Sequence, residues 1–188
     1  MKDLAEEISW IESRKEEMLA FWSLVENGTI PTRVTHNDTK ISNILFDAEG
    51  EVLCVIDLDT CMSSTSLNDF GDAIRFAANF VEEDCPEYDK VGVDLDVFRA
   101  FSEGFLAKTA KTLTPNEVDT LALSCFCLTA ELAVRFLDDY IQGDPYFKIN
   151  APDHNLVRTR CQIALAKDLL AKMPEMDKIV RDCIAAAM

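Results

Sequence analysis

The sequence is poor in basic residues. It contains 18 Lys and Arg against 34 Asp and Glu, which gives a formal charge of -16. A chain with this charge repels phosphate backbones and anionic membrane surfaces, so we expect neither a nucleic-acid partner nor a membrane partner. A phosphorylated ligand would need local help from a metal ion or from a few well-placed Lys and Arg side chains.

Patterns typical of zinc sites and disulfide frameworks are also missing. The chain has only two histidines, and none of its cysteines forms a CxxC pair. Several cysteines lie in apolar runs such as LSCFCL, where a thiol behaves as a small buried hydrophobic group in a reducing compartment. We therefore expect all the cysteines to lie in the core. They are Cys54, Cys61, Cys85, Cys125, Cys127, Cys161 and Cys183.

Leader and membrane-spanning patterns are absent as well. The N-terminus MKDLAEEISW has no apolar signal region, and no run approaches the roughly 20 apolar residues of a membrane span. With 188 residues, 48% of them hydrophobic and 28% charged, the chain has the length and composition of one folded domain. We expect a cytoplasmic protein.

Most of the chain has helical periodicity. The spacing of apolar residues predicts a helix over 3–26 that ends near Gly28. Thr114 and Glu117 form a capping box before another helix, which Gly143 ends. The full set of helices predicted after residue 60 is 66–80, 94–111, 115–141, 155–172 and 175–187.

The β-prone runs ILF and VLCVI stand on either side of DAEG, which predicts a hairpin with its turn over 47–50. The predicted fold is therefore mostly α with a small β-hairpin. The polar segment THNDTKISN leads directly into this β element.

In an antiparallel hairpin, the start of the first strand and the end of the second lie at the same end. Asn43 opens the first strand and Asp57 closes the second, so both oxygen ligands should converge beside the loop of His36, Asp38 and Lys40. An amide oxygen and a carboxylate suit Mg²⁺, which takes its other ligands from water and phosphates. Asp38 could then accept a proton from an attacking hydroxyl, and Lys40 could neutralise a phosphoryl group.

The pattern H-x-D-x-x-x-x-N, followed by an apolar hairpin and I-D-x-D, resembles the catalytic loop and metal-binding strand end of the kinase fold. The helical remainder is similar to the aminoglycoside phosphotransferase and choline kinase family. Within it, the segments THNDTK, VIDLDT, LNDFGDAIRF and RFLDDYIQGDPYFK look most like the N-acetylhexosamine 1-kinases. The resemblance covers roughly residues 20–172 and implies ATP as phosphate donor with Mg²⁺.

Carried onto this sequence, the resemblance implies a catalytic base at Asp38, a bracing role for His36, and Mg²⁺ ligands at Asn43 and Asp57. Asp59 stands where protein kinases have the glycine of D-F-G, so it is either a further metal ligand or a residue that supports the ligands.

Two positions near this site depart from the family or have a simpler explanation. Asn37 replaces the glycine that is more usual in the family. Asp69 resembles a structural aspartate of the family, with a carboxylate in the first turn of a helix as the equal alternative.

For the acceptor, the resemblance points to the helical region around Arg135 and Tyr146. An arginine fork and a tyrosine suit a polar hexosamine. The alternative for Arg135 is a helix-surface ion pair with Glu131, four residues earlier.

A kinase of this fold also needs an N-terminal β-lobe with a glycine-rich loop and a phosphate-binding lysine. Only 35 residues precede His36, and they have helical spacing. We therefore expect the C-terminal lobe alone, as a fragment or a truncated reading frame, with weak nucleotide binding and poor turnover. Its expected parts are a leading helix (1–28), a catalytic loop with metal-binding hairpin (33–60) and a helical substrate subdomain (66–188). Apolar surface left uncovered by the absent lobe would favour a homodimer.

Four alternatives compete with the hexosamine kinase. A phosphatase of the haloacid dehalogenase type would use the aspartates of VLCVIDLDT, but it requires alternating strands and helices, which this chain does not offer. A non-catalytic helical module would predict loss of Asp38, Asn43 or Asp57, and all three are present. Ordinary turn chemistry explains neither Lys40 nor the ordered spacing. The fourth is a related kinase acting on an aminoglycoside, choline, homoserine or methylthioribose.

Overall fold

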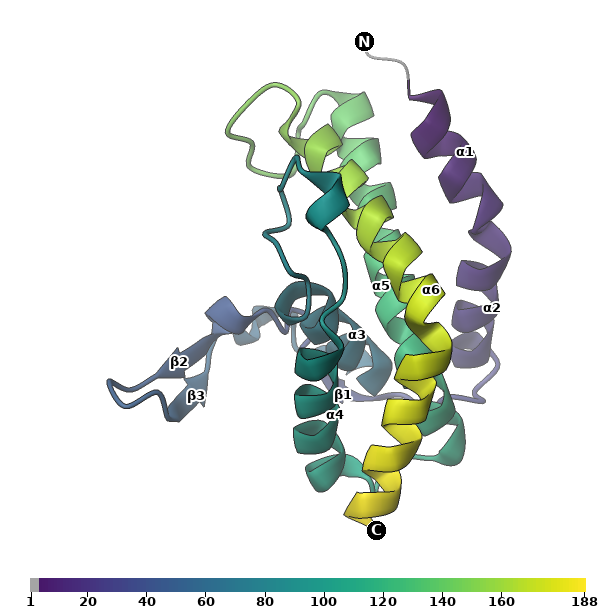
Figure 1. The fold of residues 1–188 in the computed structure, drawn as a ribbon, viewed down its shortest axis with the longest axis vertical. Helices are drawn as coiled ribbons and strands as arrows, with labels where there is room; N and C mark the ends of the chain where they lie inside the picture. The colour runs from purple at the N-terminus through teal and green to yellow at the C-terminus, as the bar shows by residue number, and fades with distance from the viewer. Residues whose placement is uncertain (1–3) are drawn as a thin grey trace.

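The computed structural model describes residues 4–188 and has a body of helices from which a short β-hairpin projects (Figure 1). The predicted mostly helical fold with a small hairpin is confirmed. The helices are α1 (Ala5–Ser13), α2 (Lys15–Glu26), α3 (Ser66–Ala77), α4 (Leu95–Thr109), α5 (Pro115–Gln142) and α6 (His154–Ala187). The strands are β1 (Arg33–Thr35), β2 (Ile44–Phe46), β3 (Val52–Val55) and β4 (Met62–Ser64), and the short 3-10 turns are η1 (Ile41–Asn43), η2 (Leu58–Thr60) and η3 (Tyr88–Lys90).

Helix α5 runs through the centre of the body and packs against α3, α6 and α2. Its start follows the predicted capping box, in which Thr114 and Glu117 exchange side-chain and backbone hydrogen bonds. It ends at Gly143, whose φ of +90° is readily adopted only by a residue without a Cβ. Both ends of the central helix were therefore predictable from local sequence.

Helix α5 overturns one expectation, because it is long and apolar enough by length and composition to cross a membrane. Of its most apolar 18-residue window, 67% is buried inside the protein, as is usual for the core helix of a helical body. Its apolar surface packs with aromatic side chains from the neighbouring helices, including Phe70 and Phe98, which are fully buried.

Helix α3 approaches α5 very closely at Gly71. A Cβ added to this glycine would lie 2.7 Å from the backbone oxygen of Ser124, which is closer than real Cβ contacts allow. The absence of a side chain at Gly71 lets the two helices reach this separation. The contact also fixes the position of α3, whose first turns face the loop predicted to be catalytic.

Two helices differ from the sequence expectations. The helix predicted over 3–26 is divided at Arg14 into α1 and α2. The break predicted near residue 173 is absent, because α6 continues through Pro174. Proline removes one backbone hydrogen bond there, but the helix on its C-terminal side is anchored in the core by Met176 and Ile179.

The cysteines are only partly as predicted. Cys125, Cys127, Cys161 and Cys183 are buried. Cys54 and Cys61 are exposed and Cys85 is half-buried, so the expectation of seven core cysteines is wrong. Cys54 lies on the exposed strand β3, and Cys61 lies between η2 and β4.

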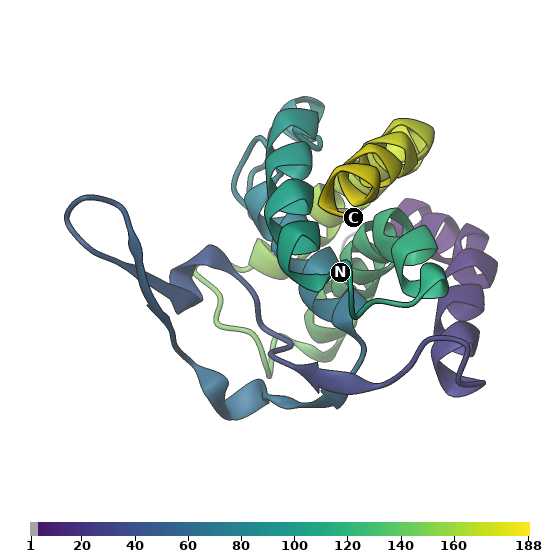
Figure 2. The same ribbon diagram turned by 90° about the horizontal axis from the view of Figure 1, so that it is seen from below.

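The strands form two antiparallel pairs, β1 with β4 and β2 with β3. The β2–β3 pair is the predicted hairpin, with Ile44 opposite Val55, and it extends away from the helices in both views (Figures 1 and 2). Every residue of β3 is exposed, including Val52 and Leu53 at 62% each. We call residues 44–56 the arm.

Candidate active site

The loop between β1 and η1 is held by two carboxylates from α3. Asp69 accepts hydrogen bonds from the backbone N–H of His36 (3.0 Å) and of Asn37 (2.8 Å). One helical turn later, Asp72 accepts from the backbone N–H of Thr39 (3.0 Å). Asp69 therefore lies in the first turn of α3 and also holds the backbone of the loop.

The Asp38 carboxylate is oriented through one of its two oxygens. Its Oδ2 accepts from Lys40 Nζ at 2.7 Å and from Asn43 Nδ2 at 2.9 Å. The residues described in the structure place no donor on Oδ1, and the side chain is 29% exposed. Asp38 is thus fixed in direction while one oxygen stays able to accept a proton.

Lys40 remains positively charged in this setting. Its hydrogen bond with Asp38 raises the pKa of the ammonium group, and the charges of Asp57 and Asp72 raise it further, against a smaller lowering by burial. The influence of Asp57 on Lys40 shows that the strand-end carboxylate lies within electrostatic range of the catalytic loop.

The same loop is tied to the base of the arm and to η2. His36 Nε2 lies 3.0 Å from the carbonyl oxygen of Ile56, and the His36 carbonyl accepts from Thr60 Oγ1 at 2.6 Å. Asn37 Nδ2 donates to the Thr60 carbonyl at 3.1 Å. Asn37 has a φ of +62°, a conformation that glycine and asparagine tolerate, so the glycine more usual in the family suits this backbone as well.

The two predicted Mg²⁺ ligands lie at the base of the arm. The backbone N–H of Ile56 donates to the Asn43 carbonyl at 2.9 Å, which brings Asp57 next to the start of β2. Asn43 is buried and uses only its Nδ2 toward Asp38, so its Oδ1 has no donor among residues 4–188. Asp57 adopts a left-handed conformation with a φ of +63°.

These oxygens fit Mg²⁺ only as part of a shared coordination shell. Within residues 4–188, no three His, Cys, Asp or Glu side chains are grouped closely enough to hold a metal ion. The exposed Asp59 in η2 therefore does not complete a carboxylate cluster with Asp38 and Asp57. An Mg²⁺ held by Asn43 and Asp57 would take its remaining ligands from water and substrate phosphates, as is usual for this ion.

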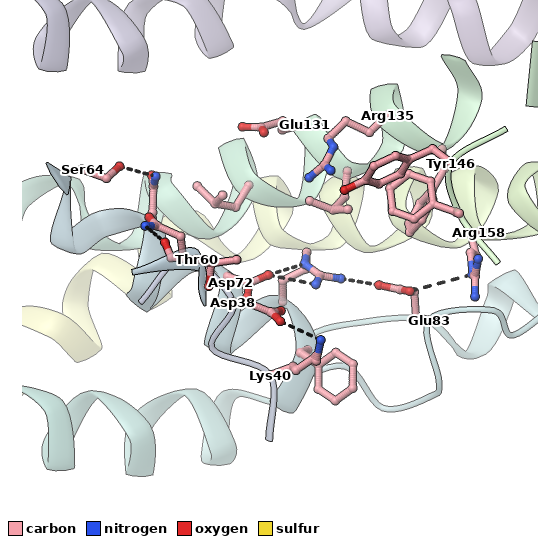
Figure 3. A pocket seen from close by; sticks show the side chains of 18 of the residues that line it. Asp38, Lys40, Thr60, Ser64, Asp72, Glu83, Glu131, Arg135, Tyr146 and Arg158 are labelled. Carbon is pink, nitrogen blue, oxygen red and sulfur yellow. Dashed lines mark hydrogen bonds and ion pairs between the residues drawn. The ribbon is translucent and has the colours of Figure 1, made fainter. Parts of the chain in front are cut away.

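A cavity of about 780 Å³ connects the catalytic loop with the helical region. Asp38 and Lys40 line it at one end, and Arg135 and Tyr146 line it as well (Figure 3). The Arg135 guanidinium lies 5.9 Å from the ring centre of Tyr146 and 5.4 Å from that of Phe147. Of the eight residues predicted for catalysis, metal binding or the acceptor, these four line the cavity. The other four lie outside its lining: His36, Asn43, Asp57 and Asp59.

The helix-surface alternative for Arg135 is not what the structure contains. Among the described residues, Arg135 makes no ion pair with Glu131 within 4 Å and instead lies over two aromatic rings. It still acts on Glu131 from a distance, because burial raises the pKa of that carboxyl and Arg135 partly opposes the rise.

A row of charged side chains that the sequence reasoning missed crosses the cavity wall. Arg75 is 8% exposed and donates to Asp72 at 2.9 Å and to Glu83 at 2.6 Å. Glu83 in turn lies 3.9 Å from Arg158, as the dashed lines in Figure 3 trace. The row therefore links the residue that holds Thr39 to the far wall of the cavity. The spacing of Asp72 and Arg75, three residues apart in a helix, was the one available signal.

The charge of the cavity differs from that of the whole chain. Despite the net charge of -16, basic side chains in its lining outnumber acidic ones by five to four. The basic ones are Lys40, Arg75, Arg135, Lys148 and Arg158, and the acidic ones are Asp38, Asp72, Glu83 and Glu131.

A model of a known protein family matches part of the chain. The APH family model, described as the phosphotransferase enzyme family, matches residues 2–101, which is just over half of the chain. The match includes the catalytic loop, the arm and α3, and ends within α4. Arg135 and Tyr146 lie outside the matched residues.

Proposed function

The chain belongs to the phosphotransferase enzyme family, and from that premise we propose that it is the catalytic lobe of an ATP-dependent small-molecule kinase whose acceptor is a sugar hydroxyl. The acceptor that we favour is the anomeric hydroxyl of an N-acetylhexosamine. One observation carries the proposal: a single cavity is lined both by Asp38 and Lys40 of the kinase-like loop and by Arg135 and Tyr146 of the helical region.

In the proposed reaction, Asp38 Oδ1 accepts the proton of the sugar hydroxyl while the hydroxyl oxygen attacks the terminal phosphorus of ATP. The bond between that phosphorus and the bridging oxygen breaks, and ADP leaves. The hydrogen bonds of Lys40 and Asn43 to Oδ2 keep the other carboxylate oxygen directed at the acceptor. Lys40 also places a positive charge beside the phosphoryl group. Mg²⁺, held by Asn43 and Asp57, would neutralise charge on the phosphates when bound.

The acceptor end supports a neutral, polyhydroxylated compound. Arg135 brings hydrogen-bond donors to the cavity, and Tyr146, 74% exposed at its rim, brings a ring face and a hydroxyl. An aromatic ring beside a planar donor group suits a sugar, whose ring has both apolar C–H faces and polar edges.

The same features disfavour the cationic acceptors used elsewhere in the family. A quaternary ammonium such as choline binds over aromatic faces. Here Arg135 lies over Tyr146 and Phe147, and Arg158 lies 5.4 Å from the ring centre of Phe136. An aminoglycoside would meet a lining in which basic groups outnumber acidic ones. Homoserine and methylthioribose remain alternatives that charge alone does not separate from a hexosamine.

Acceptor binding tests the proposal without requiring nucleotide. Isothermal titration of the 188-residue chain with N-acetylglucosamine, N-acetylgalactosamine, choline, kanamycin, homoserine and methylthioribose should give the tightest binding for an N-acetylhexosamine. Arg135→Ala and Tyr146→Ala should each weaken it, whereas Lys108→Ala, an exposed change on α4, should not. Tighter binding of any other compound in the panel would contradict the acceptor assignment.

Turnover tests the role of Asp38. When this lobe is assayed as part of a two-lobed kinase with ATP, Mg²⁺ and the best acceptor, Asp38→Asn should lower the rate of sugar phosphate formation roughly 10²- to 10⁴-fold, the usual share of a positioned base. Acceptor affinity in the same variant should stay within about twofold of the parent value, since the amide can still hydrogen-bond to the acceptor hydroxyl. Equal turnover in the variant and the parent would remove Asp38 from this role.

A further inference from the structure

A second cavity of about 450 Å³ lies where α1, η3 and α6 meet, and it shares no lining residue with the catalytic cavity. Figure 1 shows α1 running alongside the N-terminal half of α6. We call this cavity the α1–α6 groove. The side chains of its wall that matter here are Glu6, Glu7, Trp10, Tyr88, Arg160 and Lys167. Its volume is in the range of small-molecule sites.

One wall residue has an unsatisfied buried oxygen. Glu7 is only 6% exposed, and its Oε1 accepts a hydrogen bond of 2.5 Å from Arg160 Nε. Its Oε2 is buried and has no hydrogen-bond partner among residues 4–188. Buried carboxylate oxygens are nearly always hydrogen-bonded, and leaving one unpaired has a free-energy cost. A donor supplied by a ligand in the groove would remove this cost.

The rest of the wall indicates what kind of donor fits. Trp10 and Tyr88 provide aromatic surface, which attracts an ammonium group or an apolar ligand body. Arg160 is already engaged by Glu7 and also acts on the Tyr88 hydroxyl, whose pKa is raised by burial against the opposing effect of Arg160. The basic group that remains for a ligand is Lys167, which is exposed.

The wall carries two carboxylates and two basic groups, so its formal charge is zero. A ligand with one positive and one negative group preserves this balance, whereas a simple cation or anion would leave a net charge in the groove. We propose that the α1–α6 groove binds a small zwitterion of the amino-acid type, whose ammonium group donates to Glu7 Oε2 and whose carboxylate pairs with Lys167. The two aromatic residues hold its apolar part.

The chain contains two tryptophans, and they report on the two cavities separately. Trp10 lines the α1–α6 groove and Trp22 lines the catalytic cavity. The full chain labelled with 5-fluorotryptophan should give two ¹⁹F resonances, which Trp10→Phe and Trp22→Phe assign. L-phenylalanine is the zwitterionic probe. Phenethylamine lacks its carboxylate, and 3-phenylpropanoate lacks its ammonium group.

L-phenylalanine should shift the Trp10 resonance in a saturable manner and leave the Trp22 resonance in place. Phenethylamine should bind at least tenfold more weakly, and 3-phenylpropanoate should not shift Trp10 at the same concentrations. Equal binding of the amine and the zwitterion, or of the anion and the zwitterion, would overturn the assignment. So would an unmoved Trp10 resonance with all three probes at 10 mM.

Two variants separate ligand binding from folding. Glu7→Gln should weaken L-phenylalanine binding at least tenfold, with an unchanged Trp22 resonance showing that the body is intact. Lys167→Gln, at an exposed position, should weaken the binding of L-phenylalanine but not the binding of phenethylamine. If Lys167→Gln weakens neither probe, the carboxylate contact is wrong. A shift of Trp22 by N-acetylglucosamine reports on the proposed kinase site independently, so either proposal can fail without the other.

Discussion

Apolar side chains are placed in opposite ways in the helical body and in the arm. In the body, Phe70, Phe98 and Phe126 are fully buried between helices. In the arm, Val52 and Leu53 are each 62% exposed, and Phe46 is 44% exposed. The body therefore has its own core within the described residues, whereas the arm is held mainly at its base. The contacts at that base are the hydrogen bonds that also organise the catalytic loop.

The body and the arm therefore have different roles. The body positions the loop of Asp38 through Asp69 and Asp72 on α3. The base of the arm carries the predicted metal ligands Asn43 and Asp57. Changes in the body should therefore lower stability, while changes along the arm should leave stability almost intact. Substitutions in the two regions can test this separation, and the largest loss of stability is expected in the body.

Glu117→Gln should produce the largest loss of stability. This fully buried carboxylate receives hydrogen bonds from Arg33 of β1, Ser66 of α3 and Thr114 before α5. Burial alone would raise the pKa of Glu117, but the bonds from Arg33, Thr114 and Ser66 outweigh it and lower the pKa from 4.5 to about 2. A lowering of this size corresponds to about 3 kcal/mol of unfolding free energy at neutral pH.

The difference in unfolding free energy between the parent and Glu117→Gln should depend on pH in one direction. Because the pKa is lowered in the folded state, the stabilisation is present above pH 4.5 and is lost as the pH falls toward 2. Urea unfolding at pH 7, 5, 4 and 3 should show the parent and Glu117→Gln converging. The exposed change Glu175→Gln on α6 should stay within about 0.5 kcal/mol of the parent at pH 7. A gap for Glu117→Gln that is constant over this range would contradict the interpretation.

Gly71→Ala should cost about 2 kcal/mol, within the usual range for overpacking a core. The added Cβ would lie 2.7 Å from the backbone oxygen of Ser124, so α3 and α5 must move apart. Gly104→Ala is the matched control, because a Cβ on this α4 glycine meets nothing within 4 Å. The control should gain up to about 1 kcal/mol from helix propensity. Thermal unfolding of both variants gives the comparison, and equal melting temperatures would show that the close approach is unimportant.

Asp69→Asn should have a smaller effect on stability and a local effect on the loop. The amide oxygen can replace one carboxylate oxygen, but the NH₂ group cannot accept from the second backbone N–H. We expect a loss of about 1 kcal/mol and faster hydrogen exchange at His36 and Asn37, the two amides that Asp69 holds. Asp96→Asn, in the first turn of α4, should leave exchange at both amides unchanged. Unchanged exchange in Asp69→Asn would show that another contact holds the loop.

Much of the fold could be predicted because its signals are local. The capping box at Thr114 and the stop at Gly143 depend on a few neighbouring residues, and the structure confirms both. Pro174 misled the prediction because a proline penalty is local, whereas the contacts of Met176 that keep α6 continuous come from the tertiary core. Exposure of Cys54 was missed for the same reason, since burial depends on what packs against a strand.

In the candidate site, too, residues close together in the sequence were predictable and residues far apart were not. His36, Asp38 and Asn43 lie within eight residues, so their spacing alone suggested a shared role, and the structure places Asn43 against Asp38. The row from Asp72 to Arg158 joins residues far apart in the chain, and no local pattern connects them. The catalytic and metal-binding roles of the predicted residues stay predictions that turnover must test.

The smallest expected effect on stability belongs to the arm. Replacing Val52 and Leu53 by threonine keeps strand propensity, and since both are already 62% exposed, unfolding free energy should change by less than about 0.5 kcal/mol. The exposed apolar surface favours self-association, so the parent should sediment partly as a dimer at high concentration and the double variant as a monomer. Val34→Thr, 90% exposed on β1, is the control outside the arm and should leave the dimer unchanged. A dimer that survives the double change would place the contact elsewhere, and a large loss of stability would mean that the arm belongs to the cooperative core.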